Sequence, residues 1–241
     1  KYRTYNNYNL VGILNKKNDN DEIVIICHAR SSNKDSRVNT KLSNELNKNN
    51  INNFRFDFIS CGESKADYKE YSITNMIKNL EDTINMLKNK YNYTKIILFG
   101  SSIGGKIVSL IEIEKYNVIK IILWYPSLDY NRTWMNLAGK KEKYAKKIGY
   151  YQFKNGTKLS YEYFKDERSY YTFKELRKQN LPVLFVHGTN DHYVEVKSSI
   201  KVSKKCKNAK LFLIEGGDHG FHKDDDMIKA LNITVEFLLN Q

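Results

Sequence analysis

Apolar and polar positions divide the chain into two kinds of segment. In short runs nearly every position is apolar, as in a strand that is buried on both faces of a sheet. Longer segments between them carry apolar residues at intervals of three and four, the period of a helix with one buried face. Strands are predicted at residues 22–27, 54–58, 95–100, 118–126, 182–188 and 209–217. Their alternation with helices predicts an α/β fold, with a mostly parallel central sheet covered by helices on both faces.

Three of the intervening segments have a clear helical period. Ser72 precedes the strongest of them and has the side chain of a helix N-cap. The apolar residues that share one face are Val38, Leu42 and Leu46 in the first segment, Ile73, Met76, Ile77, Leu80, Ile84 and Leu87 in the second, and Ile228, Leu231, Val235 and Leu238 in the last.

One stretch, residues 127–173, breaks this regular pattern. It is irregular, basic and rich in tyrosine and phenylalanine, and it lies between two predicted core strands. So long a connection is typically an insertion over the sheet edge or a functional lid, although its aromatic residues could also pack only against one another. We expect a cap that covers the substrate. Since there are no internal repeats and no long linker, we predict a single domain over residues 1–241.

The segment "GSSIGGK" at 100–106 fits two motifs. As G-x-x-x-x-G-K it is most of a phosphate-binding P-loop, but that loop needs a Ser or Thr after the lysine to bind Mg²⁺, and Ile107 stands there. The P-loop also needs an acidic residue at the end of a neighbouring strand, for which Asp57 is the only candidate. As G-x-S-x-G the segment is a nucleophile elbow with Ser102 at its centre. The chemistry excludes the first interpretation.

A serine nucleophile needs an imidazole base, and the base needs a carboxylate that fixes its tautomer. On an α/β sheet these residues follow in the order serine, acid, histidine, each just after a strand. Asp191 follows the predicted strand 182–188, and His219 follows the strand 209–217. The sequence therefore predicts a catalytic triad of Ser102, Asp191 and His219.

Neighbouring residues offer alternatives to these three. Ser101 is not at the apex of the motif, so we expect it to pack or to form a hydrogen bond. Asp218 adjoins His219 in sequence and cannot easily reach round to orient its ring. His187 is expected to be structural, and His192 and His222 are expected to face solvent.

Acyl transfer also requires two backbone N–H groups directed at the developing oxyanion. The residue after the nucleophile, Ile103, supplies one of them. The loop after the first buried strand supplies the other, for which we expect Arg30, with Ala29 as the alternative. We expect Lys106 to point away from the site along its helix.

Composition narrows the range of partners. The chain has 40 Lys and Arg against 27 Asp and Glu, a net charge of +13. The lysines are scattered among asparagines and no nucleic-acid-binding motif accompanies them, so we expect no nucleic-acid partner. No apolar run is long enough to span a membrane, so we expect no stable membrane insertion. A homodimer stays open.

The cysteines indicate the compartment. Three of them, widely spaced and without a C-x-x-C motif, fit neither a disulfide framework nor a metal site, and a reducing compartment such as the cytoplasm suits them best. The chain begins at Lys1 without Met, which leaves a removed leader open. We expect neither a cofactor nor a metal.

Several of these segments together resemble the α/β-hydrolase superfamily, most closely its cinnamoyl and feruloyl esterase branch, which lies near monoacylglycerol lipases and certain serine peptidases. "CHARSSNK" is similar to the branch's H-G-F-x-x-N oxyanion loop, "FDFISCGES" to its F-D-x-x-G-x-G-x-S strand end, and "GSSIGG" to its G-x-S-x-G-G elbow. "VLFVHGTNDHYV" and "LFLIEGGDHGF" are similar to its acid and base segments.

This resemblance implies the same triad and the same oxyanion donors, with the aromatic insertion in the position of the family's cap. Ala29 replaces the glycine of H-G, and Arg30 replaces an aromatic residue in the wall of the acyl site, which would favour an anionic substrate. Cys61 replaces the usual glycine or histidine beside Gly62.

The expected function is a serine hydrolase that cleaves small-molecule carboxylic esters through an acyl-enzyme. The alternatives are an acyl thioesterase, a lysophospholipase or monoacylglycerol lipase, and a hydrolase fold that binds a ligand without turnover. A peptidase is a weaker alternative, because the chain lacks the extra N-terminal domain with which many relatives select peptides.

Overall fold

The computed structural model of the chain describes residues 1–4, 7–128, 132–172, 176 and 180–240, without the side chains of 132–137. Its centre is a seven-stranded sheet in the order β11-β10-β7-β6-β4-β5-β3, in which only the β3–β5 pair is antiparallel. The predicted mostly parallel sheet is therefore confirmed. The strands are β3 (Gly12–Asn15), β4 (Glu22–Cys27), β5 (Asn53–Phe56), β6 (Lys95–Ser101), β7 (Val118–Trp124), β10 (Val183–Gly188) and β11 (Ala209–Ile214).

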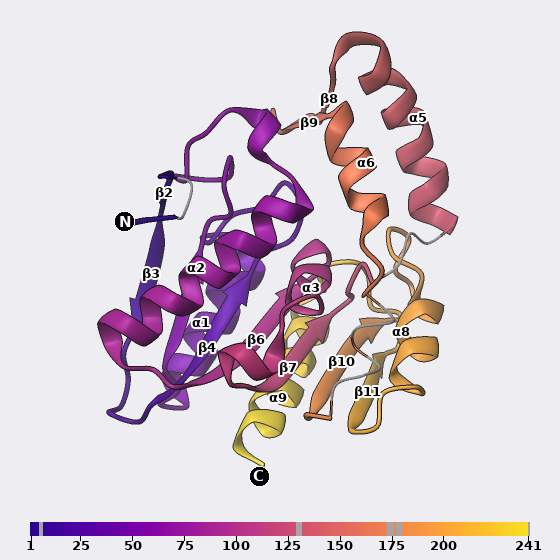
Figure 1. The fold of residues 1–241 in the computed structure, drawn as a ribbon. Helices are drawn as coiled ribbons and strands as arrows, with labels where there is room; N and C mark the ends of the chain where they lie inside the picture. Colours follow the sequence, from indigo (N-terminus) through magenta and orange to yellow (C-terminus); the bar gives the residue numbers. More distant parts are fainter. Residues whose placement is uncertain (5–6, 129–131, 173–175, 177–179, 241) are drawn as a thin grey trace.

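Helices cover both faces of this sheet (Figure 1). Side chains alternate along each strand, so Ile25 of β4 belongs to one buried cluster and Ile26 to the other. Helices α1 (Arg37–Lys48) and α9 (Asp224–Leu239) pack on the second cluster. The opposite face is covered by α2 (Ile73–Tyr91), α3 (Ile103–Val108), α4 (Ile113–Tyr116) and α8 (Val196–Ser203).

Helix α2 shows how local sequence sets an element's ends. The Ser72 hydroxyl accepts a hydrogen bond from the Asn75 N–H, which confirms the predicted N-cap. The helix ends at Asn92, which has a left-handed conformation with φ of 60°. The predicted apolar face of this helix is buried, with Met76, Leu80 and others in the main core cluster.

The aromatic insertion between β7 and β10 forms a layer of its own. It consists of α5 (Arg132–Ile148), a hairpin of β8 (Tyr150–Gln152) and β9 (Lys158–Ser160), and α6 (Tyr161–Ser169). Figure 1 shows α5 and α6 standing above one end of the sheet. Within the predicted range 127–173, residues 129–131 and 173 lie outside the described part. Tyr163 of α6 stacks on Tyr71 of the core at 5.5 Å, so the layer is packed onto the sheet domain.

Some short elements were not predicted. The edge strand β3 was missed because it has four half-buried residues and no apolar run. The first residues form a small hairpin of β1 (Tyr2–Arg3) and β2 (Asn9–Leu10), and a single 3-10 turn, η1 (Tyr68–Glu70), precedes α2. Of the described helices, none combines the length and apolar character that a membrane crossing requires.

Candidate active site

Ser102 lies at a sharp turn between β6 and α3. Its backbone has φ of 52° and ψ of −115°, a conformation that costs a non-glycine residue free energy and that is typical of functional sites. The turn is held by two hydrogen bonds: Ser102 N–H donates to the Trp124 carbonyl at 3.0 Å, and Ser127 N–H donates to the Ser102 carbonyl at 2.9 Å. The serine is thereby fixed at the carboxyl end of the central strands.

Two glycines of the motif allow this turn to pack closely. A methyl group on Gly100 would overlap the carbonyl of Gly104, and one on Gly104 would overlap the carbonyl of Cys27 at the end of β4. The backbone of α3 can therefore approach the neighbouring strand only without side chains at these positions. This close approach brings Ser102 next to the loop that follows β4.

Asp191 and His219 are brought together from the loops after β10 and β11. His219 Nδ1 donates a hydrogen bond of 2.7 Å to Asp191 Oδ2, while Asp191 Oδ1 accepts from the N–H groups of Tyr193 and Val194, both at 2.8 Å. Burial by itself raises the pKa of Asp191, but the hydrogen bonds from His187 and His219 outweigh it and hold that pKa well below its usual range. The carboxylate is therefore charged and fixed in orientation.

His187 contacts the same carboxylate from the side away from His219. Its Nε2 lies 3.2 Å from Asp191 Oδ2 and 3.1 Å from the carbonyl of Val194, and its Nδ1 lies 2.8 Å from Ser199 Oγ. Since both partners of Nε2 are acceptors, Nε2 carries the proton and Nδ1 accepts from the serine. The expectation of a structural role did not anticipate this contact with Asp191.

Asp218 pairs with a different histidine. Its carboxylate accepts from His222 Nδ1 at 2.9 Å, on a side chain of His222 that is mostly exposed. In addition, Tyr125 packs on the ring of His219, with 4.5 Å between the ring centroids. His219 is thus oriented by Asp191 on one side and by an aromatic ring on another.

Ser102 and His219 line one cavity of about 300 Å³. The side chain of Ser102 is nearly buried, and no hydrogen bond to its Oγ forms within the described residues; in substrate-free sites such bonds are often long. The insertion contributes Lys141, whose ammonium lies 4.6 Å from the ring centroid of Phe153. The other lining residues are Ala29, Arg30, Ser31, Ser127, Tyr193 and Val194.

A second cavity of about 310 Å³ lies beside the first. Ala29, Tyr193 and His219 line both cavities, so His219 stands in the wall between them. The second cavity is closed on its other sides by residues from the start of α1 and from the loop after His219.

The loop after β4 is fixed from below by His28. Its Nε2 accepts a hydrogen bond from the Phe58 N–H at 3.1 Å, so its Nδ1 carries the proton and donates to the Ala29 carbonyl at 2.8 Å. Burial lowers the pKa of His28, against the opposing effects of the Ala29 hydrogen bond and the Asp57 charge. A trans peptide unit is planar, with its C=O and N–H pointing opposite ways. The Arg30 N–H therefore points away from His28.

The side chains of Arg30 and Lys106 both extend to the insertion. Arg30 forms a 2.7 Å ion pair with Glu167 of α6, so its charge is balanced inside the protein, contrary to the expectation that it would favour an anionic substrate. Lys106 is buried, and its Nζ donates to the Glu167 carbonyl at 3.1 Å. The prediction that Lys106 points away along its helix is wrong, because the covering layer supplies a buried acceptor.

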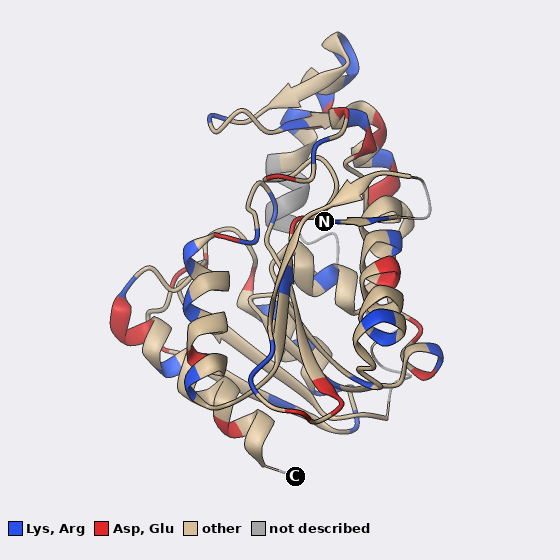
Figure 2. Cartoon of the chain, turned by 90° about the vertical axis from the view of Figure 1, so that its left-hand side faces the viewer, with Lys and Arg blue, Asp and Glu red and all other residues tan. Residues whose placement is uncertain are grey.

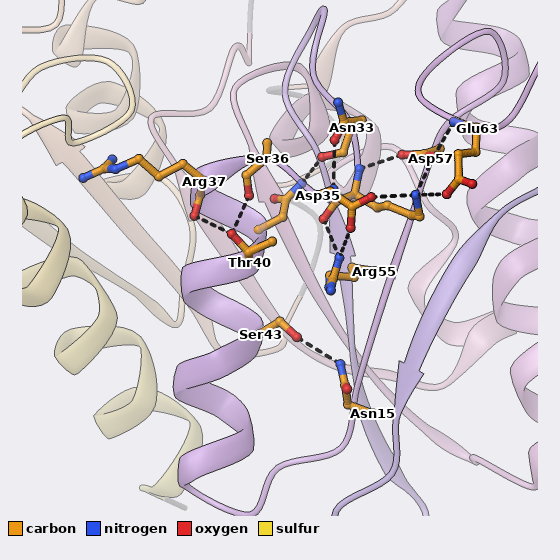
Figure 3. A network of polar contacts seen from close by, with 12 residues as sticks. Asn15, Asn33, Asp35, Ser36, Arg37, Thr40, Ser43, Arg55, Asp57 and Glu63 are labelled. Atoms are coloured by element: carbon orange, nitrogen blue, oxygen red, sulfur yellow. Dashed lines mark hydrogen bonds and ion pairs between the residues drawn. The ribbon is translucent and has the colours of Figure 1, made fainter.

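The loop after β5 carries a separate buried carboxylate (Figure 3). Asp57 accepts hydrogen bonds from the N–H groups of Lys34 at 2.6 Å and Glu63 at 2.8 Å, and its carboxylate lies 3.3 Å from Lys34 Nζ. Gly62 has φ of +49°, and a methyl group there would overlap the Asp57 carboxylate. Asp57 thus joins two loops and, unlike Asp191, contacts no residue that lines the Ser102 cavity.

Charges elsewhere do not gather into a single site. Figure 2 shows blue and red side chains spread over most elements. Among the residues that the structure describes, no group of three or more His, Cys, Asp or Glu side chains could hold a metal ion. The three cysteines are free and buried.

The sequence model of the prolyl oligopeptidase family matches residues 62–241. The chain belongs to the prolyl oligopeptidase family. The matched segment includes Ser102, Asp191 and His219, whose geometry is given above. A comparison with curated protein sequences gives no significant match.

Solved structures similar to this family member are α/β hydrolases and esterases. Est1E from Butyrivibrio proteoclasticus with ferulic acid bound has a TM-score of 0.77 at 21% identity, over 96% of both chains. Alpha/beta hydrolase domain-containing protein 10 from mouse has a TM-score of 0.76 at 17% identity, over 96% of this chain and 94% of its own. The esterase EaEST from Exiguobacterium antarcticum has a TM-score of 0.76 at 16% identity, over 98% of both chains.

At these identities the similarity establishes the fold alone. Together with the family match, it confirms the resemblance to the α/β-hydrolase superfamily. The protein is an α/β hydrolase.

Proposed function

We propose that the protein is a serine hydrolase that cleaves carboxylic esters of small molecules. The observation that carries this proposal is the Asp191–His219 hydrogen bond of 2.7 Å, placed beside a serine in an elbow conformation, with Ser102 and His219 facing one cavity. A fixed carboxylate, a histidine with one free ring nitrogen and a serine hydroxyl are the groups that acyl transfer requires.

In the proposed reaction, Ser102 Oγ attacks the ester carbonyl and its proton passes to His219 Nε2. Asp191 keeps the proton on Nδ1 and stabilises the imidazolium that forms. His219 then gives its proton to the departing alcohol, which leaves an acyl-enzyme. A water molecule, deprotonated by the same nitrogen, attacks the acyl carbonyl and releases the acid.

Two N–H groups are proposed to stabilise the oxyanion. Ile103 is the first residue of α3, so its N–H has no acceptor within the helix. Arg30 is favoured over Ala29 for the second, because the His28 hydrogen bond to the Ala29 carbonyl turns the Arg30 N–H in the opposite direction. Both Ala29 and Arg30 line the cavity that contains Ser102.

We also propose that residues 127–173 act as a cap on a single domain of residues 1–241. Lys141 and Phe153 of the insertion line the cavity with Ser102, which places part of the insertion over the acyl site. A volume of about 300 Å³ is at the small end of ligand cavities. A short or aromatic acyl group fits this size better than the long acyl chains that a lysophospholipase or monoacylglycerol lipase accepts.

The family match makes peptide cleavage the second candidate, since the same groups hydrolyse amides. A peptidase that reads a free amino terminus would need a carboxylate for its ammonium group. Among the described residues, those that line the Ser102 cavity include Arg30 and Lys141 but no Asp or Glu. The lining therefore favours an uncharged or anionic acyl group over a peptide amine.

The first test is the nucleophile. Ser102→Ala is expected to abolish both ester turnover and covalent labelling by a fluorophosphonate, while Ser101→Ala serves as the matched control and keeps both. Labelling that survives in Ser102→Ala would refute the assignment of the nucleophile.

The second test is a substrate panel. It contains nitrophenyl esters of increasing acyl length, methyl ferulate, chosen because the similar Est1E structure holds ferulic acid, an acyl thioester, and aminoacyl and dipeptidyl nitroanilides. Highest kcat/KM on short or aromatic esters supports the proposal. A preference for nitroanilides, thioesters or long acyl chains would replace it with the corresponding alternative, and tight binding without turnover would indicate a ligand-binding role.

A further inference from the structure

A buried carboxylate in the insertion joins three parts of the site. Glu167 is 1% exposed and lies near the end of α6. Its Oε1 accepts from Arg30 Nη2 at 2.7 Å, and its main-chain carbonyl accepts from Lys106 Nζ at 3.1 Å. Arg30 belongs to the loop after β4 and Lys106 to α3, the helix that begins after Ser102.

The Arg30 guanidinium is enclosed on more than one side. Besides its ion pair with Glu167, it lies 5.4 Å from the ring centroid of Tyr163, one turn earlier on α6. The Arg30 side chain is only 13% exposed. The charge of Glu167 raises the pKa of Arg30 against the lowering effect of burial. Both halves of the ion pair are thus held within the contact between the insertion and the sheet domain.

We propose that Glu167 is a positioning residue, which sets the place of the Arg30 N–H through the Arg30 side chain. This inference rests on the proposed function, in which that N–H stabilises the oxyanion. The peptide between Ala29 and Arg30 is held on one side by His28 Nδ1, at 2.8 Å from the Ala29 carbonyl. Glu167 holds the same residue from the other side, so this peptide is fixed from both the core and the insertion.

Lys106 completes the arrangement by fixing Glu167 itself. The last carbonyls of a helix have no acceptor role within it, and α6 ends at Ser169. The buried ammonium of Lys106 binds one of these carbonyls, that of Glu167, and thereby ties the end of α6 to the first turns of α3. The oxyanion loop and the helix that carries the other donor, Ile103, are therefore both referenced to one residue of the insertion.

Energetics distinguish this role from simple stabilisation. A buried ion pair gains little over well-packed apolar side chains, because both charges lose their hydration. Oxyanion donors, in contrast, must lie about 2.7–3.1 Å from the developing charge, and small displacements are costly. The ion pair is therefore expected to matter more for the rate of the chemical step than for stability.

The central experiment compares wild type with Glu167→Gln on the best ester of the panel. The amide keeps the shape of the side chain but removes the charge that holds Arg30. We expect kcat to fall about 10- to 100-fold, less than or equal to the loss of a whole oxyanion donor, with KM changed less than about threefold. The inhibition constant of a boronic acid, which forms a tetrahedral adduct on the serine, should rise by the same factor as kcat/KM falls.

Glu142→Gln is the matched control. Glu142 of α5 forms a bidentate ion pair with Arg168 of α6, with one N–O distance of 2.7 Å, in the same insertion but at its surface. This variant removes an equal charge without touching the oxyanion loop. Its kcat and boronic acid inhibition constant should match those of wild type.

A double variant, Arg30→Met with Glu167→Met, keeps apolar packing in place of the ion pair. It tests the proposal even if Glu167→Gln folds poorly, and it should be folded and as slow as Glu167→Gln. Wild-type kcat and boronic acid affinity in a folded Glu167→Gln or in the double variant would overturn the proposal. Failure of the proposed function would look different, because then wild type itself would lack ester turnover and serine labelling.

Discussion

Two buried aspartates at the ends of neighbouring strands perform different tasks. Asp57 follows β5 and Asp191 follows β10, and each accepts hydrogen bonds from two backbone N–H groups of its own region of the fold. Each also has a positively charged or protonated side-chain partner. For Asp57 that partner is the ammonium of Lys34, and for Asp191 it is the imidazole of His219.

The difference lies in what the partner touches next. Lys34 also binds the carboxylates of Asp35 and Glu63, so its charge is used entirely between two loops. His219 has a second ring nitrogen and lines the cavity that contains Ser102. Burial and backbone hydrogen bonds therefore do not by themselves mark a catalytic carboxylate. A partner that can exchange a proton and that reaches a cavity is the distinguishing feature.

The largest expected effect is on catalysis. Asp191→Asn should lower kcat about 10⁴-fold, because the amide no longer favours the His219 tautomer that has its proton on Nδ1. Circular dichroism should show a folded protein. Steady-state kinetics on the preferred ester measure the effect, and a decrease of less than tenfold would mean that Asp191 is no more catalytic than Asp57.

Asp57→Asn should instead act on stability. Removing the charge leaves Lys34 partly uncompensated in a buried position and is expected to lower the free energy of unfolding by about 3 kcal/mol, measured by urea denaturation. Asp35→Asn is the control, since the Asp35 side chain is about half exposed and its loss should cost less than about 1 kcal/mol. Equal losses in the two variants would contradict the structural role of Asp57.

Gly62→Ala should disturb the Asp57 network by about 1–3 kcal/mol, since the new methyl group combines a positive φ with overlap of the carboxylate. Gly216→Ala isolates the first contribution, because Gly216 has φ of +68° but nothing within 4 Å of an added methyl group. Thermal denaturation of both variants gives the comparison. A Gly62→Ala protein as stable as Gly216→Ala would show that the loops yield without cost.

The smallest expected effect is a difference in acid stability. The folded-state pKa of Asp191 lies below its unfolded value of about 4, so its stabilising contribution is present above that pH and is lost as the pH falls further. His28 acts in the same direction, because burial lowers its pKa and its protonation below about pH 6.5 opposes folding. Urea midpoints between about pH 7 and 3 should therefore decrease less steeply in Asp191→Asn than in wild type. Parallel curves would contradict the low pKa of Asp191.

The sequence was informative where neighbouring residues share one element. Buried strands, the Ser72 cap and the elbow follow from local patterns, and the positions of Asp191 and His219 follow from the rule that parallel strands end at one edge. The Asp57 loop was recognisable only through its family resemblance.

Contacts between the insertion and the sheet domain could not be predicted. Arg30 and Glu167 are 137 residues apart, and no periodicity relates a helix of an irregular insertion to a loop at the start of the sheet. Lys106 was misplaced for the same reason, because only the packed insertion supplies its acceptor. The contact of His187 with Asp191 depends on the path of a loop, although their spacing of four residues after one strand was a usable signal.

The backbone of Ser102 sets two demands against each other. A left-handed torsion in a residue with a side chain costs about 1–3 kcal/mol, and the native fold bears this cost at all times, including when no substrate is present. Glycine at this position would relax the turn and give a protein that melts at a higher temperature but has lost its nucleophile. The elbow is thus a point where selection for thermal resistance alone would remove the chemistry, so the torsion angle of one serine records which demand has prevailed.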